Sequence, residues 1–120
     1  LKGGALRAKR KVAIALYEYE LARYKKVVLE SFQQVADALH ALEFDAELLR
    51  ERVNSEINTK KYFEIVKMQH QLGKANYLTV LRAKEYYLKI HLKVIQAEAA
   101  RYNDTAALFQ SLGGGWWNNG

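Results

Sequence analysis

The chain has 120 residues, half of them hydrophobic, with no cysteine, no proline and a formal net charge of +6. The lack of cysteine excludes a disulfide framework and thiolate metal sites, and no apolar run approaches the roughly 20 residues of a membrane-spanning helix. The charge alone would suit nucleic acid or an anionic membrane surface. Outside a cluster at residues 7–11, however, the basic residues are spread among acids along the chain, which favours a solvated helix surface.

The first long element is predicted over residues 5–72, after an irregular lead-in at residues 1–4. It contains no glycine or proline, so it reads as one helix of about 100 Å. Its apolar residues recur at steps of three and four, through Ile14, Tyr17, Leu21, Tyr24, Val28, Phe32, Val35, Leu39, Leu42, Ala46, Leu49, Val53 and Ile57. Two places in the series carry consecutive steps of four, which locally unwind a supercoil and suit a nearly straight helix that touches several neighbours.

The chain is expected to turn at Gly73, the only glycine between Gly4 and Gly113. A glycine followed by Lys74, Ala75 and Asn76 is typical of a left-handed helix stop and a short connection. Residues 73–76 are therefore predicted to link two helices of unequal length.

The second helix is predicted over residues 77–112. One apolar line follows a heptad through Leu78, Leu81, Leu88, Leu92, Ile95, Ala99, Tyr102, Ala106 and Phe109, interrupted at Glu85. A second line runs through Val80, Ala83, Tyr87, Ile90, Val94 and Ala97. Two lines indicate two packing partners. The predicted fold is all-α, a long antiparallel, coiled-coil-like helical hairpin with a tail at residues 113–120, whose Trp116 and Trp117 are expected to bury against a neighbour.

No pattern in the sequence predicts catalysis, a cofactor or a metal site. His40, His70 and His91 are widely separated and form no ligand pair at helical spacing. Gly113 to Gly115 follow a helix, which is the wrong order for a phosphate-binding loop. His70, just before the turn, is interpreted as a packing residue rather than a pH switch.

The end of the chain carries its most specific motif, Leu112-Gly113-Gly114-Gly115-Trp116-Trp117. Together with Gly3-Gly4-Ala5-Leu6-Arg7, residues 28–39 and Gln71-Leu72-Gly73 followed by Tyr77-Leu78-Thr79-Val80-Leu81, this motif resembles the outer membrane efflux proteins. These are the TolC-like outer membrane factors of tripartite, RND-type pumps, and the similarity is greatest to the NodT lipoprotein branch. The resemblance covers nearly the whole chain.

The resemblance implies a homotrimer in which each subunit contributes four strands to an outer-membrane barrel and four helical elements to a periplasmic helical barrel. This chain would be the last part of one subunit, a fragment that lacks the strands and the first repeat. Residues 1–4 would leave the final membrane strand, and residues 73–76 would form the periplasmic tip. The implied function is passive export of small toxic compounds, as in multidrug resistance, with a periplasmic adaptor protein and, indirectly, an inner-membrane pump as partners.

The resemblance also implies two groups of functional residues. Leu72, Gly73, Lys74, Ala75 and Asn76 would contact the helical hairpin of the adaptor. Thr79 and Arg82 occupy positions just after the tip where family members often carry aspartates around the periplasmic entrance, so an acidic entrance is doubtful here. Glu85 lies three residues beyond Arg82 and could form a polar latch with it; the alternative is that Arg82 is an ordinary surface charge.

A second function class competes with the channel, namely a stand-alone coiled-coil hairpin that acts as an interaction module. The glycine and tryptophan residues at the end of the chain, together with Gly3 and Gly4, favour the channel, because a generic coiled coil has no need of them.

Overall fold

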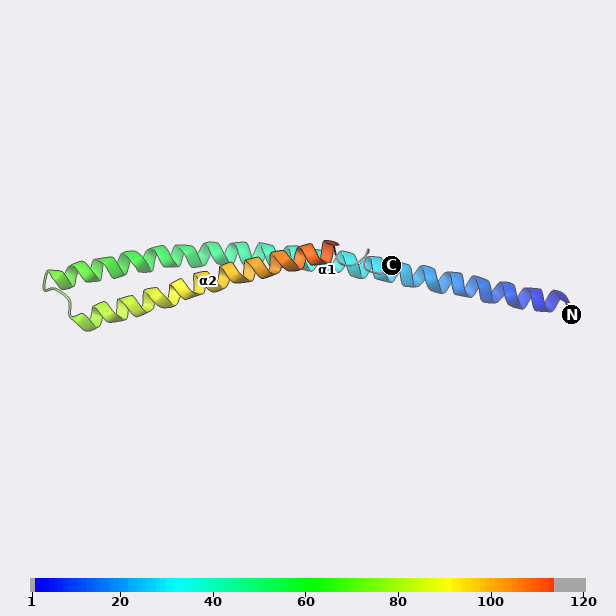
Figure 1. Ribbon diagram of the computed structural model, residues 1–120, viewed down its shortest axis with the longest axis horizontal. Helices are drawn as coiled ribbons and strands as arrows, with labels where there is room; N and C mark the ends of the chain where they lie inside the picture. Colours follow the sequence, from blue (N-terminus) through cyan, green and yellow to red (C-terminus); the bar gives the residue numbers. More distant parts are fainter. Residues whose placement is uncertain (1, 114–120) are drawn as a thin grey trace.

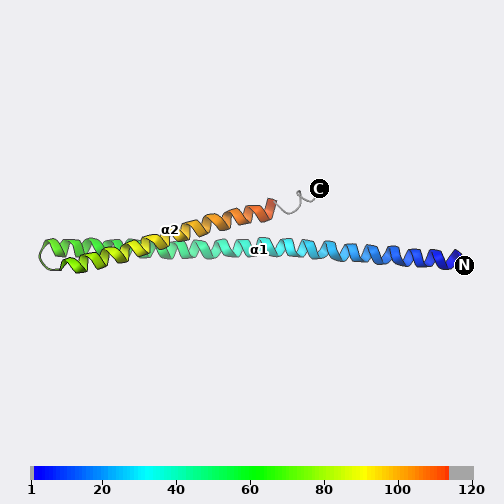
Figure 2. The same ribbon diagram turned by 60° about the horizontal axis from the view of Figure 1, so that its bottom comes forward.

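The computed structural model describes residues 2–113, which form two α-helices. Helix α1 spans Lys2–Gln71 and α2 spans Tyr77–Gly113. The helices run antiparallel from the connection at residues 72–76 and lie side by side, while the N-terminal part of α1 continues alone beyond the end of α2 (Figures 1 and 2). The rod measures 107 × 21 × 17 Å. The predicted all-α antiparallel hairpin is confirmed.

The helix bounds differ slightly from those expected. Helix α1 begins at Lys2, so the irregular lead-in predicted for residues 1–4 is wrong at Lys2, Gly3 and Gly4. Glycine costs about 1 kcal/mol in a helix but does not forbid helical dihedrals, and a long helix already nucleated downstream extends through it. Helix α1 ends at Gln71, one residue before the expected end at residue 72. Helix α2 ends at Gly113, one residue after the expected end at residue 112. The predicted burial of Trp116 and Trp117 lies outside the described residues.

The contact between the helices uses the second apolar line of α2. Val80, Ala83, Ile90, Val94 and Ala97 are all buried. They alternate between steps of three and four once the half-buried Tyr87 is included, which is the knobs-into-holes spacing of a coiled coil. On α1 the buried residues are Asp45, Thr59 and Val66, which lie whole heptads apart. The seam is therefore narrow and built largely of small side chains.

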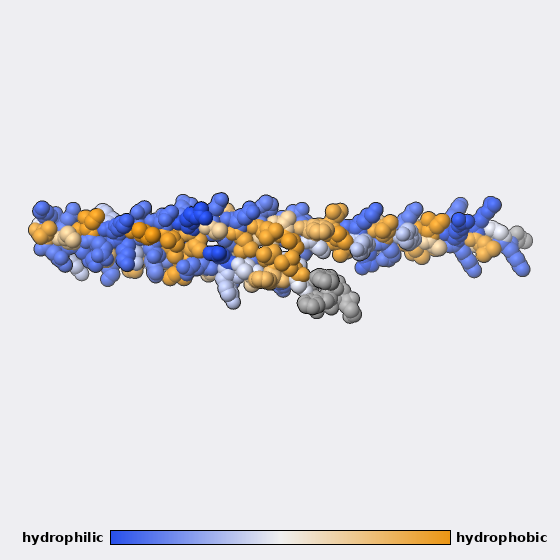
Figure 3. Space-filling view, turned by 90° about the horizontal axis from the view of Figure 1, so that it is seen from above, coloured by the Kyte–Doolittle hydropathy of each residue, from blue (hydrophilic) through white to orange (hydrophobic). Residues whose placement is uncertain are grey.

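The other apolar line of α2, which follows the heptad and carries the bulkier side chains, is exposed in the part of the chain that the structure describes. Leu78, Leu88, Leu92, Ile95, Tyr102 and Phe109 each keep about half or more of their surface in solvent. On α1 every side chain from Lys2 to Val27 is exposed, and Figure 3 shows apolar side chains along the visible face of the rod. The hairpin thus buries one line of α2 and leaves a larger apolar surface uncovered.

Candidate functional site

Backbone hydrogen bonds stop α1 at the turn. The Gly73 amide donates to the His70 carbonyl over 3.0 Å, and the Lys74 amide donates to the Gln69 carbonyl over 2.8 Å. Gly73 has φ of +76°, the left-handed conformation that glycine adopts without steric cost. This pair of bonds and this dihedral define a Schellman cap, so the predicted left-handed stop at Gly73 is confirmed.

Helix α2 starts from a side-chain cap at Asn76. The Asn76 Oδ1 atom accepts the Thr79 amide at 2.9 Å and the Thr79 hydroxyl at 2.7 Å. The Val80 amide reaches the Asn76 carbonyl at 3.4 Å. Asn76 thereby satisfies an amide of the first turn that has no partner within the helix. Asn76 and Thr79, predicted for different roles, act together in the turn.

His70 joins the two ends of the connection. Its Nδ1 atom lies 2.8 Å from the Ala75 carbonyl oxygen, so a protonated Nδ1 donates to that carbonyl. Its ring also contacts the ring of Tyr77, with centroids 5.8 Å apart. His70 therefore packs as expected and in addition holds the loop, a role that its sequence context did not indicate.

The tip residues predicted to contact an adaptor form one small surface. Leu72, Gly73, Lys74 and Asn76 are exposed, and Ala75 is half-buried. A Cβ atom added at Gly73 would meet nothing within 4 Å. Small and polar side chains on a fixed backbone leave the end of the rod accessible to another protein.

Beyond the tip, the entrance candidates lie on the first turns of α2. Arg82 and Glu85 are both exposed. The Glu85 carboxylate pairs with Lys89, with Nζ and Oε1 3.2 Å apart. The structure therefore pairs Glu85 with the residue one turn after it, and the proposed latch with Arg82 stays a prediction about the assembled protein.

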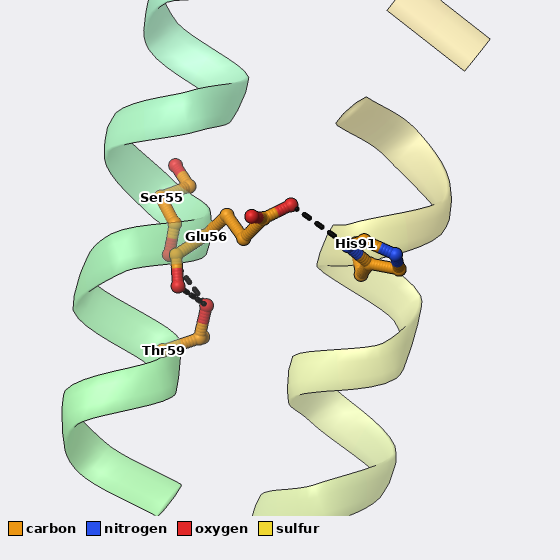
Figure 4. A network of polar contacts seen from close by, with 4 residues as sticks. All are labelled: Ser55, Glu56, Thr59 and His91. Atoms are coloured by element: carbon orange, nitrogen blue, oxygen red, sulfur yellow. Dashed lines mark hydrogen bonds and ion pairs between the residues drawn. The ribbon is translucent and has the colours of Figure 1, made fainter. Parts of the chain in front are cut away.

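Glu56 and His91 make a polar contact across the seam (Figure 4). The Oε2 atom of Glu56 lies 3.0 Å from Nδ1 of His91. One turn away on α2, the Tyr87 ring lies between two others, with centroids 6.1 Å from His91 and 6.2 Å from Phe63. On α1 the Thr59 hydroxyl bonds back to the carbonyls of Ser55 and Glu56. This contact bridges α1 and α2, and no local sequence pattern indicated it because its partners are 35 residues apart.

Asp45 forms a second cross-helix contact. It is 6% exposed. A side-chain interaction with Asp104 of α2, burial and the negative charge of Asp104 all raise the pKa of Asp45. The Oδ2 atom of Asp45 is buried without a hydrogen-bond partner. Sequence reasoning missed this pair, because no apolar pattern marks a buried carboxylate.

The described residues present neither a metal site nor a membrane-spanning helix. Among residues 2–113, no cluster of three or more His, Cys, Asp or Glu side chains is placed to hold a metal ion. In the same range neither helix is apolar enough over a sufficient length to cross a bilayer.

A family model described as outer membrane efflux protein matches residues 1–114. The chain belongs to the outer membrane efflux protein family. This membership confirms the resemblance at the level of the family, whose members are transport proteins and not enzymes; the finer assignment to the NodT branch stays a prediction.

Several curated relatives align with almost the whole chain. It is 30% identical over 113 residues to the solvent efflux pump outer membrane protein SrpC of Pseudomonas putida, and this alignment covers 94% of the chain and 24% of the relative. The pyoverdine export outer membrane protein OpmQ of Pseudomonas aeruginosa is 28% identical over 114 residues, with the same two coverages. The antibiotic efflux pump outer membrane protein ArpC of Pseudomonas putida is 25% identical over 115 residues, 95% of the chain and 24% of the relative.

The chain therefore spans about a quarter of the length of these relatives. No solved structure matches it.

Proposed function

We propose that this chain is part of the outer membrane channel component of an efflux pump and that its hairpin forms one wall segment of a periplasmic exit duct. Family membership over residues 1–114 carries this proposal. Relatives are named for solvent, toluene, antibiotic and pyoverdine export, so the proposed cargo is small toxic compounds. The protein would reside in the outer membrane, with this segment in the periplasm.

The exposed apolar line supports assembly into a larger helical wall. A free rod that keeps Leu92, Tyr102 and Phe109 at about half exposure or more has a strong hydrophobic drive to pack against further helices. We infer that other helices of the same subunit and of two further copies cover this line in a homotrimer. A stand-alone interaction module, the competing function, would need a separate binding partner to cover the same line.

The tip supports contact with a periplasmic adaptor protein. Leu72, Gly73, Lys74, Ala75 and Asn76 lie where the rod ends, on a backbone held by a Schellman cap and an Asn76 cap. Because the backbone of this surface is already held in place, docking against another helical hairpin costs little backbone entropy. An inner-membrane pump would be reached only through this adaptor.

Site-specific cross-linking in cells tests this function. The chain has no cysteine, so Lys74→Cys places a single thiol at its tip, and Lys11→Cys places one on the exposed N-terminal part of α1 as a matched control. We expect the Lys74 thiol, and not the Lys11 thiol, to cross-link to the adaptor through a short bifunctional reagent. Equal capture of the adaptor from both positions, or from neither, would contradict docking at the tip.

A further inference from the structure

Positive charge gathers in the part of the hairpin next to the turn. Residues 55–93 contain eight lysine or arginine residues and three glutamates, a net charge of +5 against +6 for the whole chain. Each of the three glutamates already has a partner, and the pairs are Glu64 with Lys67, Glu85 with Lys89 and Glu56 with His91. Within residues 2–113, Lys60 and Lys84 are exposed and take part in no ion pair.

Two contacts between the helices set the level of the residues that lie between them. Glu56 of α1 contacts His91 of α2, and the His70 ring contacts the Tyr77 ring nearer the turn. On each helix these two contacts are two heptads apart. Because the helices are antiparallel, the positions one heptad from both contacts stand level with each other as well.

These level positions are Phe63 on α1 and Lys84 on α2. Lys67 reaches the same place from α1, since its Nζ atom lies 4.6 Å from the centroid of the Phe63 ring. Lys60 precedes Lys67 by one heptad and lies on the same line of α1. Lys60, Lys67 and Lys84 therefore form a basic edge along one side of the seam, within about 6 Å of the level of Phe63 along the helix axis.

The basic edge is unfavourable for the hairpin on its own. Positions that flank the seam of paired helices commonly carry opposite charges, as Glu56 and His91 show one heptad further from the turn. On the basic edge, lysines of both helices flank one ring, and Lys67 shares its charge with Glu64 at 4.0 Å. A local arrangement that costs stability is typical of a surface that serves binding.

Beside the basic edge, α1 carries a shallow apolar hollow. Ile57 and Ile65 are each about half exposed, and they line the hollow together with Lys60, Lys61 and Glu64. Lys60 belongs to both the hollow and the basic edge. An apolar side chain seated between the two isoleucines would therefore bring the next turn of its own helix close to a lysine.

We propose that the basic edge and this hollow form an interaction surface for an acidic amphipathic helix of another protein. Its apolar side chains occupy the hollow, and its carboxylates pair with Lys60 and Lys84. Charge complementarity carries the choice of partner, because an apolar hollow accepts many helices, whereas lysines without ion pairs on both sides of the seam select carboxylates. The inference deepens the proposed docking of an adaptor, on which it rests for the identity of the partner, by giving the chemistry of the adaptor surface.

Binding of a defined helix to the full-length protein in detergent tests this surface. The probe is a fluorescent synthetic helix with a heptad repeat of leucine and glutamate, and its control peptide carries lysine in place of glutamate. By fluorescence anisotropy at about 50 mM salt, we expect Lys60→Glu combined with Lys84→Glu to weaken binding of the acidic helix at least about tenfold. The affinity of the wild type for the acidic helix should fall as the salt concentration rises.

Two further double variants are matched controls for charge and for folding. Lys9→Glu with Lys25→Glu changes the net charge by the same amount at exposed positions on the N-terminal part of α1, and should alter the affinity by less than about twofold. Lys60→Arg with Lys84→Arg keeps both charges and should bind the acidic helix like the wild type. Equal binding of the two peptides, or equal losses from the two glutamate double variants, would overturn the proposal.

Cross-linking in cells separates this inference from the proposed function. In the Lys74→Cys background, we expect Lys60→Glu with Lys84→Glu to reduce capture of the adaptor at least about fivefold. Undiminished capture would overturn an acidic adaptor surface and leave docking at the tip intact. Absence of capture from Lys74→Cys without the charge reversals would contradict docking at the tip, and with it the adaptor as the partner of the basic edge.

Discussion

Glu56 and His91 meet across the hairpin with Oε2 and Nδ1 3.0 Å apart, although 35 residues separate them in the chain. The Glu56 side chain is 25% exposed and the His91 side chain 47%. Next to them the ring of Tyr87 on α2 stacks both with the ring of Phe63 on α1 and with that of His91 on α2. A directional contact beside a ring stack selects one register out of those that a narrow seam of small residues permits.

Removing this contact should destabilise the hairpin modestly. Because His91 is about half exposed, we expect His91→Ala and Glu56→Ala each to lower the free energy of unfolding by about 0.5–1 kcal/mol. Chemical denaturation of the single and double variants gives the coupling energy through a double-mutant cycle. His40→Ala, an exposed histidine that pairs only within α1, is the control. A coupling energy of zero would mean that the contact does not hold the register.

Substitutions at Gly73 should act through the backbone. Since φ is +76° and the space around the glycine is open, Gly73→Ala should cost about 1–2 kcal/mol in stability. Gly73→Asn should cost less, because asparagine tolerates the left-handed region. Thermal melts of the two variants check this order. Equal losses would indicate that the new side chain, and not the dihedral, is responsible.

Enlarging a seam residue should separate the helices. Ala83 is 3% exposed and packs beside Val66 and Val80 in the core cluster. We expect Ala83→Leu to destabilise the hairpin by about 1–3 kcal/mol, because overpacking forces the helices apart.

Ala99→Leu provides the matched control on the exposed face of α2. In the hairpin alone it should change stability by less than about 0.5 kcal/mol. Denaturant titration compares the two variants on the same helix. A larger loss from Ala99→Leu than from Ala83→Leu would show that the bulkier line forms the seam.

The entrance hypothesis predicts a change in conductance. If Arg82 and Glu85 form a latch in the assembled channel, Glu85 must exchange its partner, because it pairs with Lys89 at 3.2 Å in this structure. Arg82→Ala and Glu85→Ala should then raise single-channel conductance in planar bilayers. Lys89→Ala should lower the conductance or leave it unchanged. Unchanged conductance and ion selectivity in the first two variants would leave Arg82 as an ordinary surface charge.

The two helices and the turn between them follow from the residue pattern alone. Apolar residues at steps of three and four, one glycine at position 73 and the absence of proline allow little other than two long helices joined there. Local chemistry also determined how the helices end, because a Schellman cap needs a residue that tolerates positive φ, and an N-cap needs a short polar side chain such as that of Asn76. The family resemblance was equally readable from motifs along the chain.

Which faces of the two helices meet depends on how the whole hairpin packs. The sequence offered two apolar lines on α2 and did not indicate which of them meets α1. The structure buries the line of Val80, Ala83 and Val94, because small side chains let two helices approach closely while bulky ones suit additional neighbours. On α1 the matching face carries Asp45 and Thr59, which no hydrophobic pattern marks. Cross-helix pairs such as Asp45 with Asp104 depend on the register, and that register exists only after the hairpin has closed.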